Sequence, residues 1–106
     1  MNDRIKFSGH TMGAPKCDIF EVIELFKSIG YDGIEVRVAA DGQIDSEKLT
    51  DEEARKIDAA ARAKGMEFSC LTSYYQNFVK MEEREDVIRN LKRVIEIAAL
   101  LHCPLV

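Results

Sequence analysis

The chain has 106 residues, 46% of them hydrophobic and 32% charged, which is the composition of an ordinary globular domain. Its formal net charge of −4 argues against a dedicated nucleic-acid binder, because such proteins depend on Lys and Arg contacts to phosphates. Three widely spaced cysteines and the lack of a long apolar segment indicate a cytoplasmic protein with reduced thiols and no membrane partner.

The N-terminal part of the chain predicts one strand followed by one helix. A short run of β-forming residues favours a strand over Ile5–Gly9. Asp18 and Glu21 have the spacing of a capping box, so a helix should begin after Asp18 and end at Gly30, a residue that supplies a left-handed cap. The buried stripe expected for this helix consists of Ile19, Val22, Ile23, Phe26 and Ile29.

A second strand and helix follow directly. The strand should span Gly33–Val38. Thr50 is the expected N-cap of the helix, with Glu53 as its capping-box partner, and Gly65 ends it. The apolar face of this helix is thin and rich in alanine, with Ala54, Ile57 and Ala61.

The last part of the chain predicts a third strand over Met66–Leu71 and a long helix over Glu83–Leu101. The expected apolar side of that helix consists of Val87, Ile88, Leu91, Val94, Ile95, Ala98 and Leu101. Pro104-Leu105-Val106 then has the character of a fourth strand that is just beginning. We therefore expect a single (βα)3β unit over residues 1–106, with parallel strands and open sheet edges.

The second strand distinguishes a barrel from a doubly wound sheet. A strand covered by helices on both faces is apolar throughout, whereas this one alternates. Ile34, Val36 and Val38 share one face, and Glu35 and Arg37 share the other. In a closed barrel the second face is the interior, so the α/β class expected here is a partial (β/α)8 TIM barrel. Glu35 and Arg37 would then either bind substrate or form a structural ion pair across the interior.

The run from Ile29 to Val36, which reads IGYDGIEV, resembles a signature of the xylose-isomerase-like TIM barrels at their second strand. Two further segments support this resemblance, namely Gly65-Met66-Glu67-Phe68 before the third strand and the alanine-rich helix end from Ala98 to Pro104. The resemblance covers nearly the whole chain in order and spacing. It implies that residues 1–106 are the N-terminal half of such a barrel.

This resemblance implies the activity of a sugar or sugar phosphate isomerase or epimerase. Such barrels hold a divalent metal (Mn, Mg, Co or Zn) through Glu, Asp and His residues of later strands. In the epimerases two of the Glu ligands also serve as acid and base. We expect this chain alone to bind no metal and to be inactive alone, contributing the front rim of the substrate pocket.

Several side chains are candidates for sugar binding beside Glu35 and Arg37. His10 follows the first strand, and loops at this end of a barrel carry the chemistry, although a lone loop histidine is also a common surface group. The segment after the third strand offers Thr72, Tyr74 and Gln76, which suit a sugar because aromatic rings stack on its faces and amides bond its hydroxyls. The aromatic residues of this segment could equally cap the mouth of the barrel.

Alternatives from other classes remain open at this stage. A non-enzymatic half-barrel could hide its open edges by forming a homo-oligomer. A flavodoxin-like or receiver domain also begins with (βα)3β, although His10-Thr11 and Thr72-Ser73 stand where a receiver would need acidic residues. An endonuclease-type relative is disfavoured by the acidic balance. His102, which follows the last helix, is expected to make a helix-capping contact.

Overall fold

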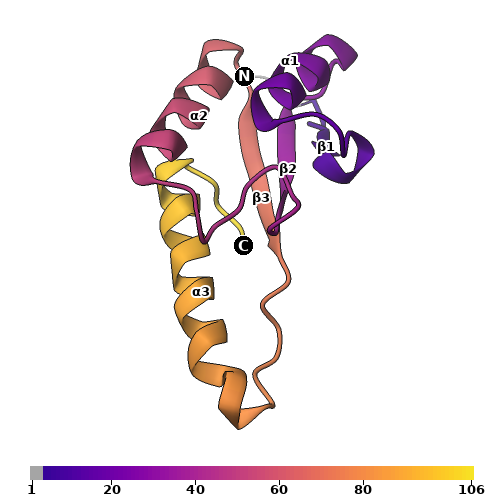
Figure 1. Ribbon diagram of the computed structural model, residues 1–106. Coiled ribbons are helices and arrows are strands. Elements are labelled where there is room, and N and C mark those ends of the chain that lie inside the picture. Colours follow the sequence, from indigo (N-terminus) through magenta and orange to yellow (C-terminus); the bar gives the residue numbers. More distant parts are fainter. Residues whose placement is uncertain (1–3) are drawn as a thin grey trace.

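The computed structural model describes residues 4–106, in which strands and helices alternate along the chain (Figure 1). Within this range the strands are β1 (Ser8–His10), β2 (Gly33–Val38) and β3 (Glu67–Ser73). The helices are α1 (Ile19–Ile29), α2 (Asp51–Ala63) and α3 (Met81–Leu100), and a 3-10 turn, η1 (Thr11–Gly13), comes directly after β1.

The sheet has the order β1-β2-β3, and both pairs of neighbouring strands are parallel. This order confirms the partial barrel and excludes the flavodoxin-like alternative, in which the first strand lies between the second and the third. Within residues 4–106, neither β1 nor β3 has a second neighbouring strand, so the sheet is open.

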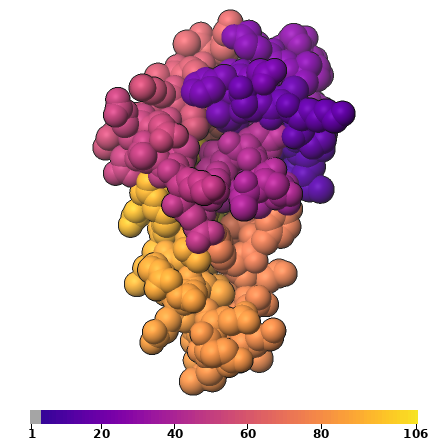
Figure 2. Space-filling view, in the orientation of Figure 1, coloured from indigo at the N-terminus to yellow at the C-terminus, as the bar shows by residue number. Residues whose placement is uncertain are grey.

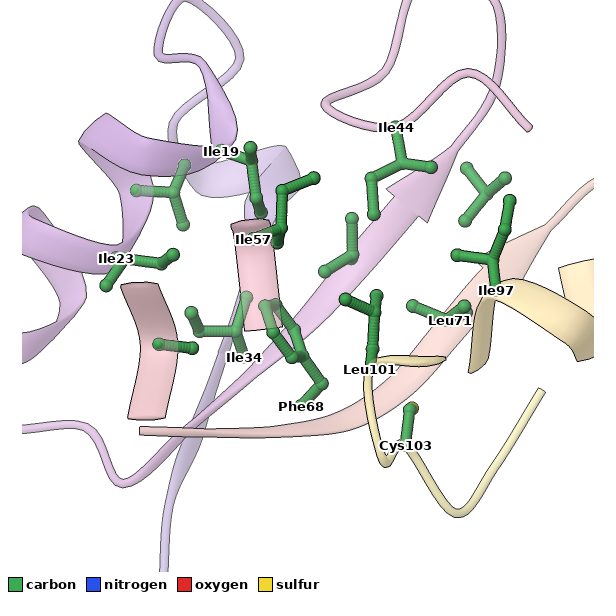
Figure 3. Packing of buried hydrophobic residues seen from close by; sticks show 14 of the residues in the cluster. Ile19, Ile23, Ile34, Ile44, Ile57, Phe68, Leu71, Ile97, Leu101 and Cys103 are labelled. Carbon is green, nitrogen blue, oxygen red and sulfur yellow. The ribbon is translucent and has the colours of Figure 1, made fainter. Parts of the chain in front are cut away.

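The helices cover one face of the sheet. In the view of Figure 1, α2 lies above α3, and the two helices contact each other and β3. Helix α1 packs against α2 and β2. Apolar side chains of the strands and of the helices meet between these layers (Figure 3). Ile44, from the segment after β2, is fully buried in the same core and forms a single bridge pair with Val38. The polar face of β2 is therefore the one turned away from the helices.

The expected N-caps of α1 and α2 are confirmed, and the capping box is complete at α1. Asp18 accepts a hydrogen bond from the Glu21 amide, and the Glu21 side chain accepts one from the Asp18 amide. Gly30 ends α1 with a φ of 102°, a backbone conformation that residues other than glycine rarely adopt. Thr50 caps α2 by accepting from the Glu53 amide at 3.1 Å. The Glu53 carboxylate accepts from the Thr50 hydroxyl at 3.0 Å and not from the Thr50 amide, so the expected capping box is not formed here. Ile29 was expected in the buried stripe of α1, but it is exposed because it lies at the last turn, beyond the sheet.

The predicted first strand is placed too early. It begins at Ser8 because its partner β2 begins at Gly33, and these two residues are paired in the register. The preceding residues are held differently, since the Asp32 carboxylate accepts from the Phe7 amide at 2.9 Å and pairs with Arg4. The third strand also differs, running from Glu67 to Ser73, so Thr72 belongs to the strand and not to the loop after it.

The buried side of α3 differs from the prediction at one edge. Val87, Val94, Ala98 and the following Leu101 are buried as expected, but Ile88 and Ile95 are exposed and Ile97 is buried in their place. Leu91 and Ile95 instead line a groove of about 440 Å³ along the open side of β3. Pro104–Val106 forms no strand within the described chain, although the Leu71 amide donates to the Leu105 carbonyl at 3.0 Å. The chain therefore turns back alongside β3 at this point.

Candidate functional site

The inner face of β2, which is the polar face turned away from the helices, carries the two charged residues predicted from its alternation. Ile34, Val36 and Val38 are buried against the helices, whereas Glu35 and Arg37 are only partly buried. Across β1, His10 is the register partner of Glu35, so the imidazole and the carboxylate share one face of the sheet. The strands thus bring the Glu35 carboxylate, the His10 imidazole and the Arg37 guanidinium to one face of the sheet.

A β-bulge in β3 decides which of its side chains join this face. The register pairs Ile34 with Phe68 but Glu35 with Cys70, which leaves Ser69 as the extra residue. The strand's alternation is shifted by one after the bulge. Leu71 consequently enters the apolar core with no exposed surface, and Thr72 becomes the partner of Arg37 on the inner face.

Glu35 is held by the neighbouring strand. The Thr72 hydroxyl donates a hydrogen bond of 2.8 Å to Glu35 Oε1, and both side chains are part-buried. Burial raises the pKa of the Cys70 thiol, and the carboxylate of Glu35 raises it further. Glu35 is therefore a fixed acceptor on this face, and Cys70 beside it is a neutral thiol near neutral pH.

Arg37 has a different set of partners, so the structural ion pair with Glu35 that the sequence left open is not formed. Its Nη1 lies 2.8 Å from Asp41 Oδ1, and its guanidinium carbon lies 5.3 Å from the centre of the Tyr74 ring. The hydrogen bond to Asp41, together with one to Tyr74, raises the pKa of Arg37 above its usual range. The same contact lowers the pKa of Asp41. The guanidinium is permanently charged, and the Tyr74 ring restricts its orientation.

The loop after β1 is fixed by its own hydrogen bonds. His10 caps η1 by accepting from the Met12 amide through Nδ1 at 3.0 Å, which leaves Nε2 as the nitrogen available to a ligand. Thr11 is fully buried, and its hydroxyl accepts from the Arg37 amide at 2.9 Å. The sequence predicted that His10 contacts the substrate. The structure places His10 on the inner face, where it also caps η1.

Two residues at this end were not found from the sequence. Gln43 donates from its amide nitrogen to the carbonyls of Ala14 at 3.1 Å and Cys17 at 3.2 Å, and so ties the segment after β2 to the loop after β1. Figure 2 shows this segment, in magenta, lying across the middle of the face drawn. Asp41 lies in the same segment. The Asp41-Gly42 pair was a turn signal that could have directed attention to it.

The segment after β3 contributes unevenly. Tyr74 lies over Arg37 as described, and the Tyr75 hydroxyl lies 3.4 Å from Ser46 Oγ. Gln76 is exposed, and within residues 4–106 it makes no hydrogen bond with the other candidates. The loop that carries it extends with the start of α3 away from the rest of the chain (Figure 1). The structure thus brings together five of the six predicted residues: His10, Glu35, Arg37, Thr72 and Tyr74.

A cavity of about 200 Å³ lies at this end of the strands, lined by Thr11, Met12, Pro15, Arg37, Asp41 and Gln43.

A larger cavity of about 660 Å³ lies at the opposite end, where β3 begins and α2 and α3 end. It contains His102, whose amide donates to the Ala99 carbonyl at 3.2 Å and whose Nδ1 lies 3.3 Å from Asp58 Oδ1. His102 therefore caps a helix end, as expected. In parallel barrels that end serves stability, and ligands bind at the end where Arg37 lies.

The described residues do not fit the metal that the resemblance implies. In residues 4–106, no three His, Cys, Asp or Glu side chains come together in a group that could hold a metal ion. None of the helices within residues 4–106 combines the length and the hydropathy of a membrane span.

The family profile described as xylose isomerase-like TIM barrel matches residues 23–106 of the chain. Among solved structures, a xylose isomerase domain containing protein from Salmonella typhimurium LT2 is similar, with a TM-score of 0.71 and 18% sequence identity. That similarity covers 97% of this chain and 36% of that chain, so this chain spans little more than a third of its length. At this identity the similarity concerns the fold. No curated protein matches the chain.

Proposed function

Because the chain belongs to the xylose isomerase-like TIM barrel family, we propose that it forms the N-terminal part of a metal-dependent sugar or sugar phosphate isomerase or epimerase. The observation that supports this most is the inner face of β2 and β3. There Glu35, Thr72 and the Arg37–Tyr74 pair converge at the strand ends where barrels bind ligands. We assign the chain to the cytoplasm, which its free cysteines favour.

In this proposal each side chain has a distinct role toward the sugar. Glu35 accepts a hydrogen bond from a sugar hydroxyl, and Thr72 keeps the carboxylate in position. Tyr74 presents a ring face against which a sugar can stack. The Nε2 of His10 reaches the same face from β1. These residues bind and orient the substrate, which is the contribution of the front rim.

A divalent metal held elsewhere in such an enzyme would supply a Lewis acid for the substrate carbonyl. Its ligands are assigned here to other strands of the complete barrel, because the described residues offer no such group. The proton transfers next to the carbonyl are assigned to those strands as well. The chain alone is accordingly proposed to be inactive.

Activity and metal content of the purified chain test this assignment. After incubation with Mn²⁺, Mg²⁺, Co²⁺ or Zn²⁺ and desalting, the chain should retain no stoichiometric metal. It should also not interconvert ketoses and aldoses. Turnover of a ketose by the chain with bound metal would refute it. In the complete barrel, Glu35→Gln should lower kcat/KM by about tenfold or more without changing metal content. An unchanged kcat/KM would remove Glu35 from the site.

A second candidate function is that of a self-associating half-barrel, which the open edge of β3 favours. The groove of about 440 Å³ along this edge exposes Leu91, Ile95 and Val106, and a second copy of the chain could cover it. Light scattering after size-exclusion chromatography distinguishes the two cases. A monomer at all concentrations that unfolds in one sharp transition would exclude obligatory pairing.

A further inference from the structure

We propose that the cavity of about 200 Å³ beside Arg37 binds an oxyanion carried by the substrate, so that the site selects anionic sugars over neutral ones. The oxyanion is either a phosphate ester or the carboxylate of a sugar acid. This inference rests on the proposed function and extends it, since it names the class of sugar that the front rim recognises.

The first support is the state of the Arg37 guanidinium. Its side chain is 25% exposed, so most of it is shielded from water, while its charge is permanent. Tyr74 lies over the group at 5.3 Å and restricts its plane. A guanidinium has five N–H donors in a rigid fork that matches phosphate and carboxylate oxygens. A partly buried guanidinium at a cavity wall, covered by an aromatic ring, is suited to recognise an oxyanion.

The second support is the weakness of its present carboxylate partner. Asp41 is 81% exposed, and an ion pair at such a position contributes about 0–1 kcal/mol to stability. Within residues 4–106, Asp41 is the one carboxylate that pairs with Arg37. The neighbouring carboxylate of Glu35 accepts from Thr72 instead. A ligand oxyanion can therefore displace Asp41 at little cost. The aspartate then swings into solvent.

The third support is the size and construction of the cavity. Pockets for whole ligands measure about 300–1,000 Å³, so a cavity of about 200 Å³ fits one functional group rather than a sugar ring. Its walls are held in place, since Gln43 bonds the Ala14 carbonyl and Thr11 bonds the Arg37 amide. The ring would then lie toward Glu35 and Thr72, which do not line this cavity.

The cavity at the opposite end of the strands lacks these properties. Arg62 there is paired with Asp58, whose side chain is only 16% exposed, and His102 contacts the same carboxylate. Glu67 adds a second acidic group to that lining. A partly buried carboxylate that holds two basic groups is not readily displaced by an incoming anion. The oxyanion site is therefore assigned to Arg37.

Titration of the ¹⁵N-labelled chain with inorganic phosphate or malonate, followed through the Arg37 side-chain and backbone resonances, tests the anion site. Arg37→Gln should weaken binding by about tenfold or more. Asp41→Asn removes the competing carboxylate from an exposed position and should tighten binding up to about fivefold. Arg89→Gln and Asp86→Asn, in the exposed ion pair on α3, are matched controls that should leave binding unchanged.

The results separate site-specific binding from a general effect of charge. If phosphate and malonate perturb Arg37, and Asp41→Asn alone tightens binding, the proposal holds. Equal effects of the Asp41 and Asp86 substitutions would overturn it. Weakened binding on Asp41→Asn would also overturn it. A dispersed spectrum for each variant confirms that the fold is retained.

A matched set of sugars distinguishes this inference from the proposed function. Glucose 6-phosphate and glucuronate should bind more tightly than glucose, and the tighter of the two identifies the oxyanion as phosphate or carboxylate. If glucose binds as tightly as both at Glu35 and Thr72, the anion inference is wrong while the sugar site stands. If none of the three perturbs this face, both proposals fail.

Discussion

The hydroxyl of Thr72 lies 2.8 Å from Glu35 Oε1 and joins β3 to β2 on the polar face of the sheet. This contact depends on the bulge at Ser69, because without the extra residue Thr72 would face the helices. One irregularity in the ladder thus places Leu71 in the core and a hydrogen-bond donor beside the carboxylate.

Replacing Thr72 by Val should remove this hydrogen bond and leave a part-buried carboxylate with fewer partners. We expect the free energy of unfolding to fall by about 1–2 kcal/mol, measured by urea denaturation. Thr72→Ser keeps the hydroxyl and is the matched control. Equal losses for the two variants would mean that the threonine methyl group, and not the hydrogen bond, stabilises the sheet.

Gly9 allows two aromatic rings to pack against β1. A Cβ at this position would lie 2.6 Å from Tyr31 Cε2 and 2.8 Å from Phe26 Cε2, and these rings pack edge to face. Gly9→Ala should therefore cost about 1–3 kcal/mol in the free energy of unfolding, measured by urea denaturation. Gly13→Ala is the control, since no atom lies within 4 Å of the added carbon. A neutral Gly9→Ala would show that the rings move aside freely.

Asp32 should make stability depend on pH in the acid range. Its hydrogen bond with Arg4 and one from the Phe7 amide lower its pKa from 3.8 to about 2 in the folded chain. A lowered pKa stabilises the fold above the unfolded value, and this contribution is lost as the pH falls from 3.8 to about 2. Unfolding measured across this range should show a shallower pH dependence for Asp32→Asn. Parallel curves for the two proteins would contradict the assignment.

The thiols of Cys70 and Cys103 should react slowly. Burial raises the pKa of Cys103 and of Cys70, and Glu35 raises that of Cys70 further. At pH 8 iodoacetamide should therefore label both more slowly than glutathione, as measured by mass spectrometry. Glu35→Gln should speed the labelling of Cys70 and not that of Cys103. If the variant labels Cys70 at the original rate, the carboxylate does not influence this thiol.

Local signals made much of the fold predictable. The capping box at Asp18 and Glu21, the left-handed Gly30 and the alternation of β2 each depend on residues close in the sequence. The same alternation predicted that Glu35 and Arg37 would share a polar face. Parallel order then followed from the spacing of the units.

The remaining features depend on contacts between distant segments. The bulge at Ser69 is fixed by pairing between β2 and β3 and leaves no mark in the local pattern. Asp41 reaches Arg37 because the segment after β2 folds back and forms its own backbone bonds, such as Ala39 N–H to the Ile44 carbonyl at 3.0 Å. The exposure of Ile88 and Ile95 reflects the open edge of β3, which periodicity alone does not reveal.

A map of backbone amide shifts during titration with glucose 6-phosphate tests most directly whether the polar face of β2 and β3 is the sugar site. The largest shifts should lie at His10, Glu35, Arg37, Thr72 and Tyr74. Shifts centred instead on Asp58 and His102, in the cavity at the opposite end of the strands, would contradict it.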